Sequence, residues 1–430
     1  MVATLAAQPW DTTVDQLLDF SSAPVDTQPA YLTDANKGDW EKEYLLQQWW
    51  LNRMATSSSP LQEKLTLFWH GHFATANYKV GDMLLMYQQN ALFRANATGN
   101  FRDLVHQMSL QPAMLLWLDN DPNVKGSPNE NFARELMELF TLGVNQYTQD
   151  DVVSAARAWT GHNVDYGATP RMYRFYPTRH DTGAKLFMGT SQNWDGPDII
   201  TRILTVEPQR SIAARFIAKK LWTFFAYPNP APSVLDSLTT AFVSSTLDVK
   251  TLLRAIFLHP EFYSVTARQG LVRSPVEWVV ACLRALGFTA ADTNPQWWLE
   301  EMGQQLFYPP NVAGWKNNAY WVNSTALWAR ADFARNLTWK ANNAGFLAEI
   351  MQRDVSNHHV MTAADAVDLA YRKFGLTSST GSISPYVRGV LMTWLDTQFA
   401  SEYAPTYSWT HWAPIDLTTM MMLTPDVQLA

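Results

Sequence analysis

The residues with the clearest chemical potential lie in one loop, at 119–130, between two apolar stretches. Six positions alternate in the way that the oxygen ligands of a calcium-binding EF-hand loop do; they are Asp119, Asp121, Asn123, Lys125, Ser127 and Glu130. The pattern departs from an EF-hand at position 6, where Val124 replaces the glycine that the sharp turn needs. The sequence predicts a Ca²⁺ site with the ligands Asp119, Asp121, Asn123, Ser127 and Glu130. In the alternative reading, Asp119 ends one helix and Glu130 completes the capping box of the next.

The helix predicted after this loop carries a second candidate, Glu135. At about 100° per residue, Glu135 falls at the edge of the apolar face, whereas Glu130, Arg134 and Glu138 form a polar ladder on the other side. A carboxyl group at such an edge needs a partner or takes a raised pKa, which suits a catalytic acid or base. The alternative is an ordinary buried ion pair. We expect Glu138 and Arg134 to contribute to ligand binding beside Glu135.

The sequence His70-Gly71-His72 invites a metal interpretation, but it lies on a helix predicted to begin at Ser59. On that helix His72 shares the core face, while His70 points to the opposite, outer face. Two side chains on opposite sides of a helix cannot bind one ion. We therefore expect His72 to be a core histidine or a site residue that faces Glu135. We expect His70, on the outer face, to point to solvent or to bond to a neighbouring residue.

A third group of candidates surrounds His180-Asp181, in the predicted turn of a small hairpin. Asp181 can orient His180, which would make the imidazole a general base. The alternative is a turn that Asp181 stabilises by accepting a bond from its own backbone. His162 is a further candidate for the lining of the same pocket.

Composition narrows the class of protein. The chain has 430 residues, of which 47% are hydrophobic, so it can bury a large core. A formal charge of −7 argues against a nucleic-acid partner, which would require a basic face. The 19 tryptophans form a core or, in part, a platform for sugars, for which the candidates are Trp69, Trp315 and Trp321. The single cysteine, Cys282, lies in an apolar helical run and is expected to be a small buried residue.

Helical periodicity dominates the chain and predicts an all-α, multi-helix fold with a small β-hairpin near 172–188. We expect an N-terminal helical segment (1–58), a main helical domain (59–345) with a hairpin insertion at 163–197, and a C-terminal helical segment (346–430) packed on the main domain. No apolar stretch reaches the length needed to span a membrane, and the first residues lack the features of a signal peptide.

Several long motifs resemble a bacterial family known only as domain of unknown function 1800. They are Phe68-Trp69-His70-Gly71-His72-Phe73, the stretch from Pro128 to Gly143, His180 to Gly189, and Pro309-Pro310-Asn311-Val312-Ala313-Gly314-Trp315. The resemblance implies a helical fold and export to the periplasm or the medium, with a cytoplasmic paralogue as the alternative. It also implies a neighbouring sulfatase-like protein as a partner. The segment His180-Asp181-Thr182-Gly183-Ala184-Lys185 recurs in that family, whereas Thr160-Gly161-His162 departs from its usual Thr-Gly-Trp.

These observations favour a hydrolase that acts on a carbohydrate or cell-envelope polymer. Its catalytic residues would be Glu135, His72, His180 and Asp181, with tryptophans as the binding platform. The first alternative is a non-enzymatic binding or assembly protein stabilised by Ca²⁺ at the 119–130 loop. The second is a transition-metal oxidoreductase that uses His70, His72 and His162. No phosphate-binding glycine loop is present, so no nucleotide cofactor is expected.

Overall fold

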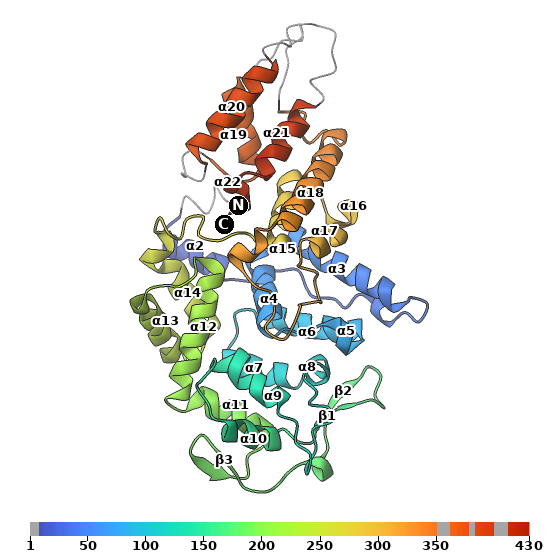
Figure 1. The fold of residues 1–430 in the computed structure, drawn as a ribbon, viewed down its shortest axis with the longest axis vertical. Helices are drawn as coiled ribbons and strands as arrows, with labels where there is room; N and C mark the ends of the chain where they lie inside the picture. Colours follow the sequence, from blue (N-terminus) through green and yellow to red (C-terminus); the bar gives the residue numbers. More distant parts are fainter. Residues whose placement is uncertain (1–7, 351–361, 378–382, 400–411, 430) are drawn as a thin grey trace. The chain divides into compact units, whose positions relative to one another are not determined.

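The computed structural model describes residues 8–350, 362–377, 383–399 and 412–429. They group into two compact units, coloured by sequence in Figure 1. Unit 1 comprises 1–46, 57–264 and 306–315; unit 2 comprises 47–56, 265–305 and 316–430. The three-part division expected from the sequence stays a prediction.

Helices make up most of unit 1, which confirms the predicted fold class. One helix, α3 (Asp39–Thr56), is divided between the two units, since it begins in unit 1 and ends in unit 2. The other helices and helical turns of unit 1 are α2 (Trp10–Leu17), η1 (Ala30–Thr33), α4 (Pro60–His72), α5 (Asn77–Val80), α6 (Met83–Ala95), α7 (Phe101–Ser109), α8 (Pro112–Trp117), α9 (Asn131–Glu135), η2 (Leu136–Thr141), α10 (Gln149–Ala158), η3 (Pro177–Arg179), α11 (Gly196–Thr205), α12 (Gln209–Phe225), α13 (Pro232–Ser244), α14 (Val249–Leu258) and η4 (Pro260–Tyr263).

Unit 1 also contains two short antiparallel hairpins. Strand β1 (His162–Asp165) pairs with β2 (Met172–Phe175), and β3 (Lys185–Phe187) pairs with β4 (Thr190–Gln192). They lie at the end of unit 1 formed by α8 to α11, where β1 contacts α8 and β3 contacts α10 (Figure 1). Sequence reasoning located β2 and β3 correctly but paired them with each other. They do not pair, because Met188 (φ 45°) and Gly189 (φ 78°) form a two-residue turn that folds β3 back onto β4.

Helix starts follow the capping signals in part. Ser274 and Thr148 each form a complete capping box at the starts of α15 (Pro275–Leu286) and α10. The capping box that Glu130 was expected to complete does not form, since α9 begins at Asn131 without a hydrogen bond from a capping side chain. The Asn123 side chain accepts a bond from the Asn129 amide at 2.9 Å, which holds 127–130 as part of the preceding loop.

Sequence-distant segments of unit 1 meet at two glycines. Gly314 has a φ of +77°, and a β-carbon placed on it would lie 2.2 Å from the carbonyl oxygen of Gly71. The segment 306–315 thereby lies directly against the end of α4. This contact joins two of the motifs that stood out in the sequence, and the close backbone approach explains the glycine at position 314.

The regular elements of unit 2 are all helical among its described residues, which also contain one isolated antiparallel bridge between Val272 and Leu429. Besides the end of α3 and α15, its elements are α16 (Ala290–Thr293), α17 (Gln296–Glu301), η5 (Asn318–Trp321), α18 (Ser324–Asn343), α19 (Ala363–Lys373), α20 (Pro385–Phe399), α21 (Ala413–Met422) and α22 (Pro425–Gln428). The long helix α18 packs against α17 and α21, and α21 also contacts α19 and α20. Cys282 is fully buried and unbonded, as predicted. None of the helices in the described part of either unit is long and apolar enough to cross a membrane.

Candidate functional site

The side chains of His162, His180 and Asp195 converge at the hairpin end of unit 1. One potential ligand atom from each lies within 4.8 Å of the others. His162 Nε2 is 2.7 Å from Asp195 Oδ1. The rings of the two histidines lie edge to face, with their centroids 6.3 Å apart. Among the described residues, no other set of three His, Cys, Asp or Glu side chains gathers in this way.

Backbone geometry brings the two histidines together. Gly161, which precedes β1, has a φ of +82°, and a β-carbon there would lie 2.8 Å from the Tyr176 carbonyl oxygen and 3.1 Å from the His180 amide nitrogen. Only glycine therefore allows the chain around 176–180 to approach the start of β1 so closely. The Phe175 ring then covers His162 and His180, at centroid distances of 4.8 and 5.4 Å.

Each histidine is oriented by an oxygen on its outer side. His180 Nδ1 donates to the Thr160 carbonyl at 2.8 Å, because a carbonyl can only accept. His162 Nδ1 lies 2.9 Å from the Tyr173 hydroxyl. His162 is 2% exposed and His180 is 8% exposed, so both rings are held rigidly inside the protein.

The carboxylate of Asp195 is the accessible member of the cluster, with 43% of its side chain exposed. It is the N-cap of α11 and accepts the Gly196 amide at 2.8 Å. Burial alone would raise the pKa of Asp195, but the hydrogen bond and charge of His162 together with the Gly196 amide outweigh it and lower the pKa. Burial also raises the pKa of Tyr173 to about 12, so that phenol stays protonated at neutral pH.

Asp181 does not orient His180, contrary to the sequence hypothesis. Arg157 Nε donates to its carboxylate at 2.7 Å, and the Gly183 amide donates at 2.8 Å. The buried Lys185 ammonium donates to the carbonyls of Asp181 and Gly183 at 2.5 and 3.0 Å. The segment 181–185 is thus a closed turn, in agreement with the alternative interpretation, and it supports His180 through the backbone.

Glu135 lies half-buried at the end of α9, at the edge of the apolar face as expected. Burial raises its pKa, and the neighbouring Glu138 adds to this effect while Arg134 opposes it. Glu138 accepts the Tyr147 hydroxyl at 2.5 Å, and Arg134 pairs with Glu130 at 3.0 Å. Among the described residues, no hydrogen bond, ion pair or ring contact joins Glu135 to His72 or His180.

His72 instead caps the C-terminal end of the helical stretch that follows Glu135, by hydrogen bonding to one of its last carbonyls. Residues 136–141 form a π-helical turn, η2, in which the Leu142 amide donates to Met137 five residues back. His72 Nε2 donates to the free Phe140 carbonyl at 3.1 Å, and Lys220 Nζ donates to the Leu139 carbonyl and to His72 Nδ1 at 3.1 and 2.9 Å. His72 and Lys220 therefore satisfy the carbonyls at the end of η2.

His70 is buried, and its predicted surface position is wrong. Its Nε2 accepts the Phe307 amide at 3.3 Å, and its ring contacts those of Phe307 and Trp315 at 5.4 Å each. Segment 306–315 covers this face of α4, which helical periodicity cannot reveal. The residues His70, His72 and His162, proposed together as metal ligands, have different partners and form no cluster.

The carboxylates of the 119–130 loop also point to different partners. Asp119 pairs with Lys79 at 2.8 Å, and Asp121 accepts the Val164 amide and the Tyr166 hydroxyl at 2.8 and 2.9 Å. Asn123 is fully buried and bonded to the Ala156 carbonyl, while Glu130 binds Arg134, and Ser127 is exposed. This arrangement offers no converging set of oxygens, and a Ca²⁺ site in the loop stays a prediction.

The three candidate platform tryptophans differ in exposure. Trp69 and Trp321 are 0% and 1% exposed, so they belong to the cores of unit 1 and unit 2, respectively. Trp315 is only partly covered, beside His70. Other tryptophans are exposed in both units, including Trp10 and Trp40 in unit 1 and Trp297 and Trp328 in unit 2. The rings of Trp297 and Trp328 lie edge to face, with their centroids 6.1 Å apart.

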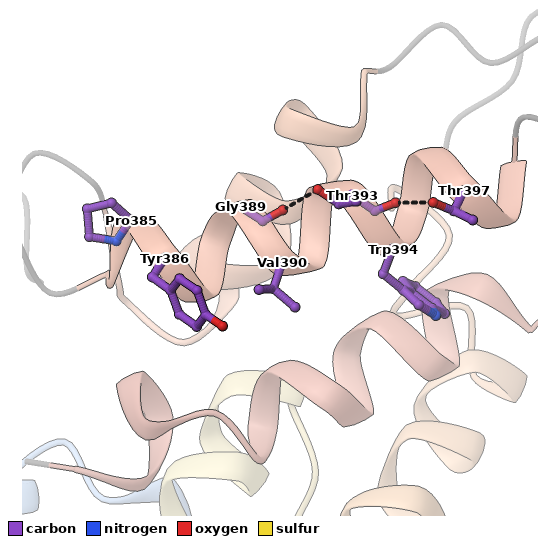
Figure 2. Close-up of a pocket in the computed structure, with 7 residues that line it drawn as sticks. All are labelled: Pro385, Tyr386, Gly389, Val390, Thr393, Trp394 and Thr397. Carbon is purple, nitrogen blue, oxygen red and sulfur yellow. Dashed lines mark hydrogen bonds between the residues drawn. The ribbon is translucent and has the colours of Figure 1, made fainter.

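A pocket of about 600 Å³ lies along α20 in unit 2 (Figure 2). It is lined by Pro385, Tyr386, Gly389, Val390, Thr393, Trp394 and Thr397. The Thr393 and Thr397 hydroxyls donate to carbonyls of their own helix at 2.9 and 2.7 Å, as the dashed lines show. The lining contains no acid or histidine, so we assign no chemistry to this pocket.

Comparison with known proteins places the chain in a family without assigning an activity. The model of the family described as "Protein of unknown function (DUF1800)" matches residues 1–429, so the chain belongs to this family. No curated protein matches the chain, and no solved structure does.

Sequence reasoning found His162 and His180 but missed Asp195, Tyr173 and Lys220. Asp195 carries a helix-start signal, because Pro197 and Asp198 follow it in the first turn. That signal identifies a cap but says nothing of a histidine 33 residues earlier. Tyr173 and Lys220 carry no local signal, since their partners are set by tertiary contacts.

Proposed function

We propose that the protein is a carboxylate- and histidine-dependent hydrolase whose reactive groups are His162, His180 and Asp195. The observation that supports this proposal is the convergence of the three groups beside an accessible carboxylate. The substrate class proposed is a carbohydrate or cell-envelope polymer, cleaved at an ester or glycosidic bond.

In this proposal His180 Nε2 is the general base. The Thr160 carbonyl fixes the proton on Nδ1, which leaves a lone pair on Nε2. Nε2 takes a proton from a water molecule as the water oxygen bonds to the scissile carbon. The imidazolium then returns this proton to the leaving oxygen.

The other two groups support this proton transfer electrostatically. The charge of Asp195 stabilises the imidazolium that forms on His180, and the hydrogen bond from His162 holds the carboxylate in place. Phe175 limits access of bulk water to both rings, which strengthens these interactions.

Turnover can be tested with a panel of polysaccharides and isolated bacterial envelopes. We expect released reducing ends or carboxylates with the wild-type protein, and a loss of at least about 100-fold in His180→Gln. His106→Gln is the matched control, because His106 is a partly buried histidine of unit 1 outside the cluster. Full turnover in a folded His180→Gln variant would remove the site from the reaction.

A further inference from the structure

We infer that His162, His180 and Asp195 bind a divalent first-row transition metal ion, with Zn²⁺ as the reference ion. The inference deepens the proposed function, and only its catalytic consequence rests on that proposal. Two imidazole nitrogens and one carboxylate oxygen are a donor set that zinc and its neighbours take in proteins.

The outer nitrogens of the histidines are arranged as in metal sites. A histidine that binds a metal usually donates its other N–H to an oxygen, which fixes the tautomer and the ring. His180 Nδ1 has such a partner in the Thr160 carbonyl, and His162 Nδ1 has one in the Tyr173 hydroxyl. Both Nε2 atoms are therefore the ones directed to the centre of the cluster.

The distances fit an ion after small movements. Ligands of a tetrahedral ion with bonds of about 2.05 Å lie about 3.3 Å apart. His162 Nε2 and Asp195 Oδ1 are closer, at 2.7 Å, since they share a proton, while the widest separation in the set reaches no more than 4.8 Å. An ion displaces that proton, moves Asp195 outwards and draws His180 inwards.

The state of the ligands also favours binding. Asp195 contributes a carboxylate oxygen, and the negative charge of a carboxylate ligand offsets part of the charge of the ion. The Tyr173 hydroxyl can either donate or accept a hydrogen bond. It donates to His162 Nδ1 when His162 Nε2–H donates to Asp195, and it would accept from His162 Nδ1–H when Nε2 binds a metal.

Three protein ligands leave at least one position for water, as in catalytic rather than structural zinc sites. The exposed part of Asp195 places this position at the surface of unit 1. A metal on His180 Nε2 would take the lone pair that the proposed function gives to the general base. In that state the ion would lower the pKa of its bound water to near 7, and the resulting hydroxide would be the nucleophile in place of a water deprotonated by His180.

The inference can be tested without any substrate. The full chain is stripped with EDTA and titrated with Zn²⁺ by calorimetry and with Co²⁺ by visible absorption. We expect one ion per chain and the intense d–d bands of a four- or five-coordinate Co²⁺ site. His162→Gln, His180→Gln and Asp195→Asn should each weaken binding by at least about 100-fold, and His106→Gln should bind as the wild type does.

The inference would be overturned by an absence of binding to the wild-type protein, or by binding that all three variants retain. The Co²⁺ spectrum of the wild-type protein keeps the test decisive if a variant does not fold, because weak octahedral bands would also contradict it. Metal binding without hydrolysis would refute only the proposed function. Hydrolysis by a protein that binds no metal would refute only this inference.

Discussion

The carbonyl oxygen of Gly71 occupies the place that a side chain on Gly314 would need. A β-carbon on Gly314 would lie 2.2 Å from this oxygen, although 243 positions separate the two residues in the chain (314 − 71). The contact involves main-chain atoms on one side, which cannot rotate away as a side chain can. The packing of segment 306–315 on α4 therefore depends on glycine at this position.

We expect Gly314→Ala to lower the free energy of unfolding by more than about 3 kcal/mol. Alanine is disfavoured at the positive φ of this position, and its β-carbon would clash with the Gly71 carbonyl oxygen. Gly189→Ala is the control, because Gly189 has nearly the same φ, +78°, with no atom within 4 Å of its β-carbon. That control should lose only about 1 kcal/mol. If urea denaturation showed the same loss of stability in Gly314→Ala and Gly189→Ala, the close approach to Gly71 would not be the cause of the destabilisation at Gly314.

A buried ion pair in unit 1 gives a second prediction. Arg94 donates to both carboxylate oxygens of Glu63 at 2.8 and 2.9 Å, and both side chains are at most 2% exposed. Arg94→Met should cost roughly 3–5 kcal/mol, because it leaves a buried charge without this partner. The double variant Glu63→Leu/Arg94→Met should be more stable than Arg94→Met, and additive losses would contradict this account. For comparison, Arg254→Ala removes an exposed ion pair with Asp15 and should lower stability far less than Arg94→Met does.

The two histidines of α4 predict sensitivity to acid. Burial lowers the pKa of His70 to about 3 and that of His72 well below its usual value, so both stay neutral in the folded protein. The unfolded chain protonates them below pH 6.5, and stability is therefore lost as the pH falls from 6.5 towards 3. Each contributes a slope of roughly 1.4 kcal/mol per pH unit. Urea titrations between pH 6 and 4 should show a shallower slope in His70→Gln, and an unchanged slope would refute the assignment.

Lys220 gives a prediction for the alkaline range, where stability should again rise with pH. Burial lowers its pKa from 10.5 to about 8, so the unfolded chain binds more protons than the folded protein between these values. Stability should rise with pH across this window, by up to about 3 kcal/mol. The difference in unfolding free energy between wild type and Lys220→Met, measured from pH 7.5 to 10.5, should follow this rise. A difference that is constant with pH would contradict it.

Tyr173 tests the orientation of His162. Tyr173→Phe removes the oxygen that holds His162 Nδ1, and we expect Co²⁺ affinity to fall by roughly 10-fold with the fold intact. Tyr166→Phe is a matched control near the same hairpin, because the Tyr166 hydroxyl binds Asp121 outside the cluster. Equal affinities in both variants would show that the phenol does not orient a ligand.

Much of the local structure could be predicted from the sequence. The mainly helical class, the core face of His72 and the edge position of Glu135 follow from periodicity that spans only a few turns. Local reasoning failed where a distant segment or a tight turn intervened: segment 306–315 buries His70, and the turn at Met188 and Gly189 pairs β3 with β4 instead of β2.

The candidate site was only partly predictable, because its members belong to three separate segments. His162 and His180 stood out by residue type, but the partner assigned to His180 was Asp181, its neighbour in sequence. In the structure Arg157 takes Asp181, and Asp195 meets His162 from the start of α11. Proximity along the chain was therefore a poor guide to proximity in space.

The sequence alone determined most of the segments that become helices and the apolar stripe that each of these helices buries, since these depend on propensities and spacing within about a dozen residues. Only the tertiary structure decided that His162, His180 and Asp195 share one site and that Gly71 meets Gly314. The physical reason is that such contacts join segments whose approach is set by the packing of several elements at once. No periodicity within any one segment records that packing.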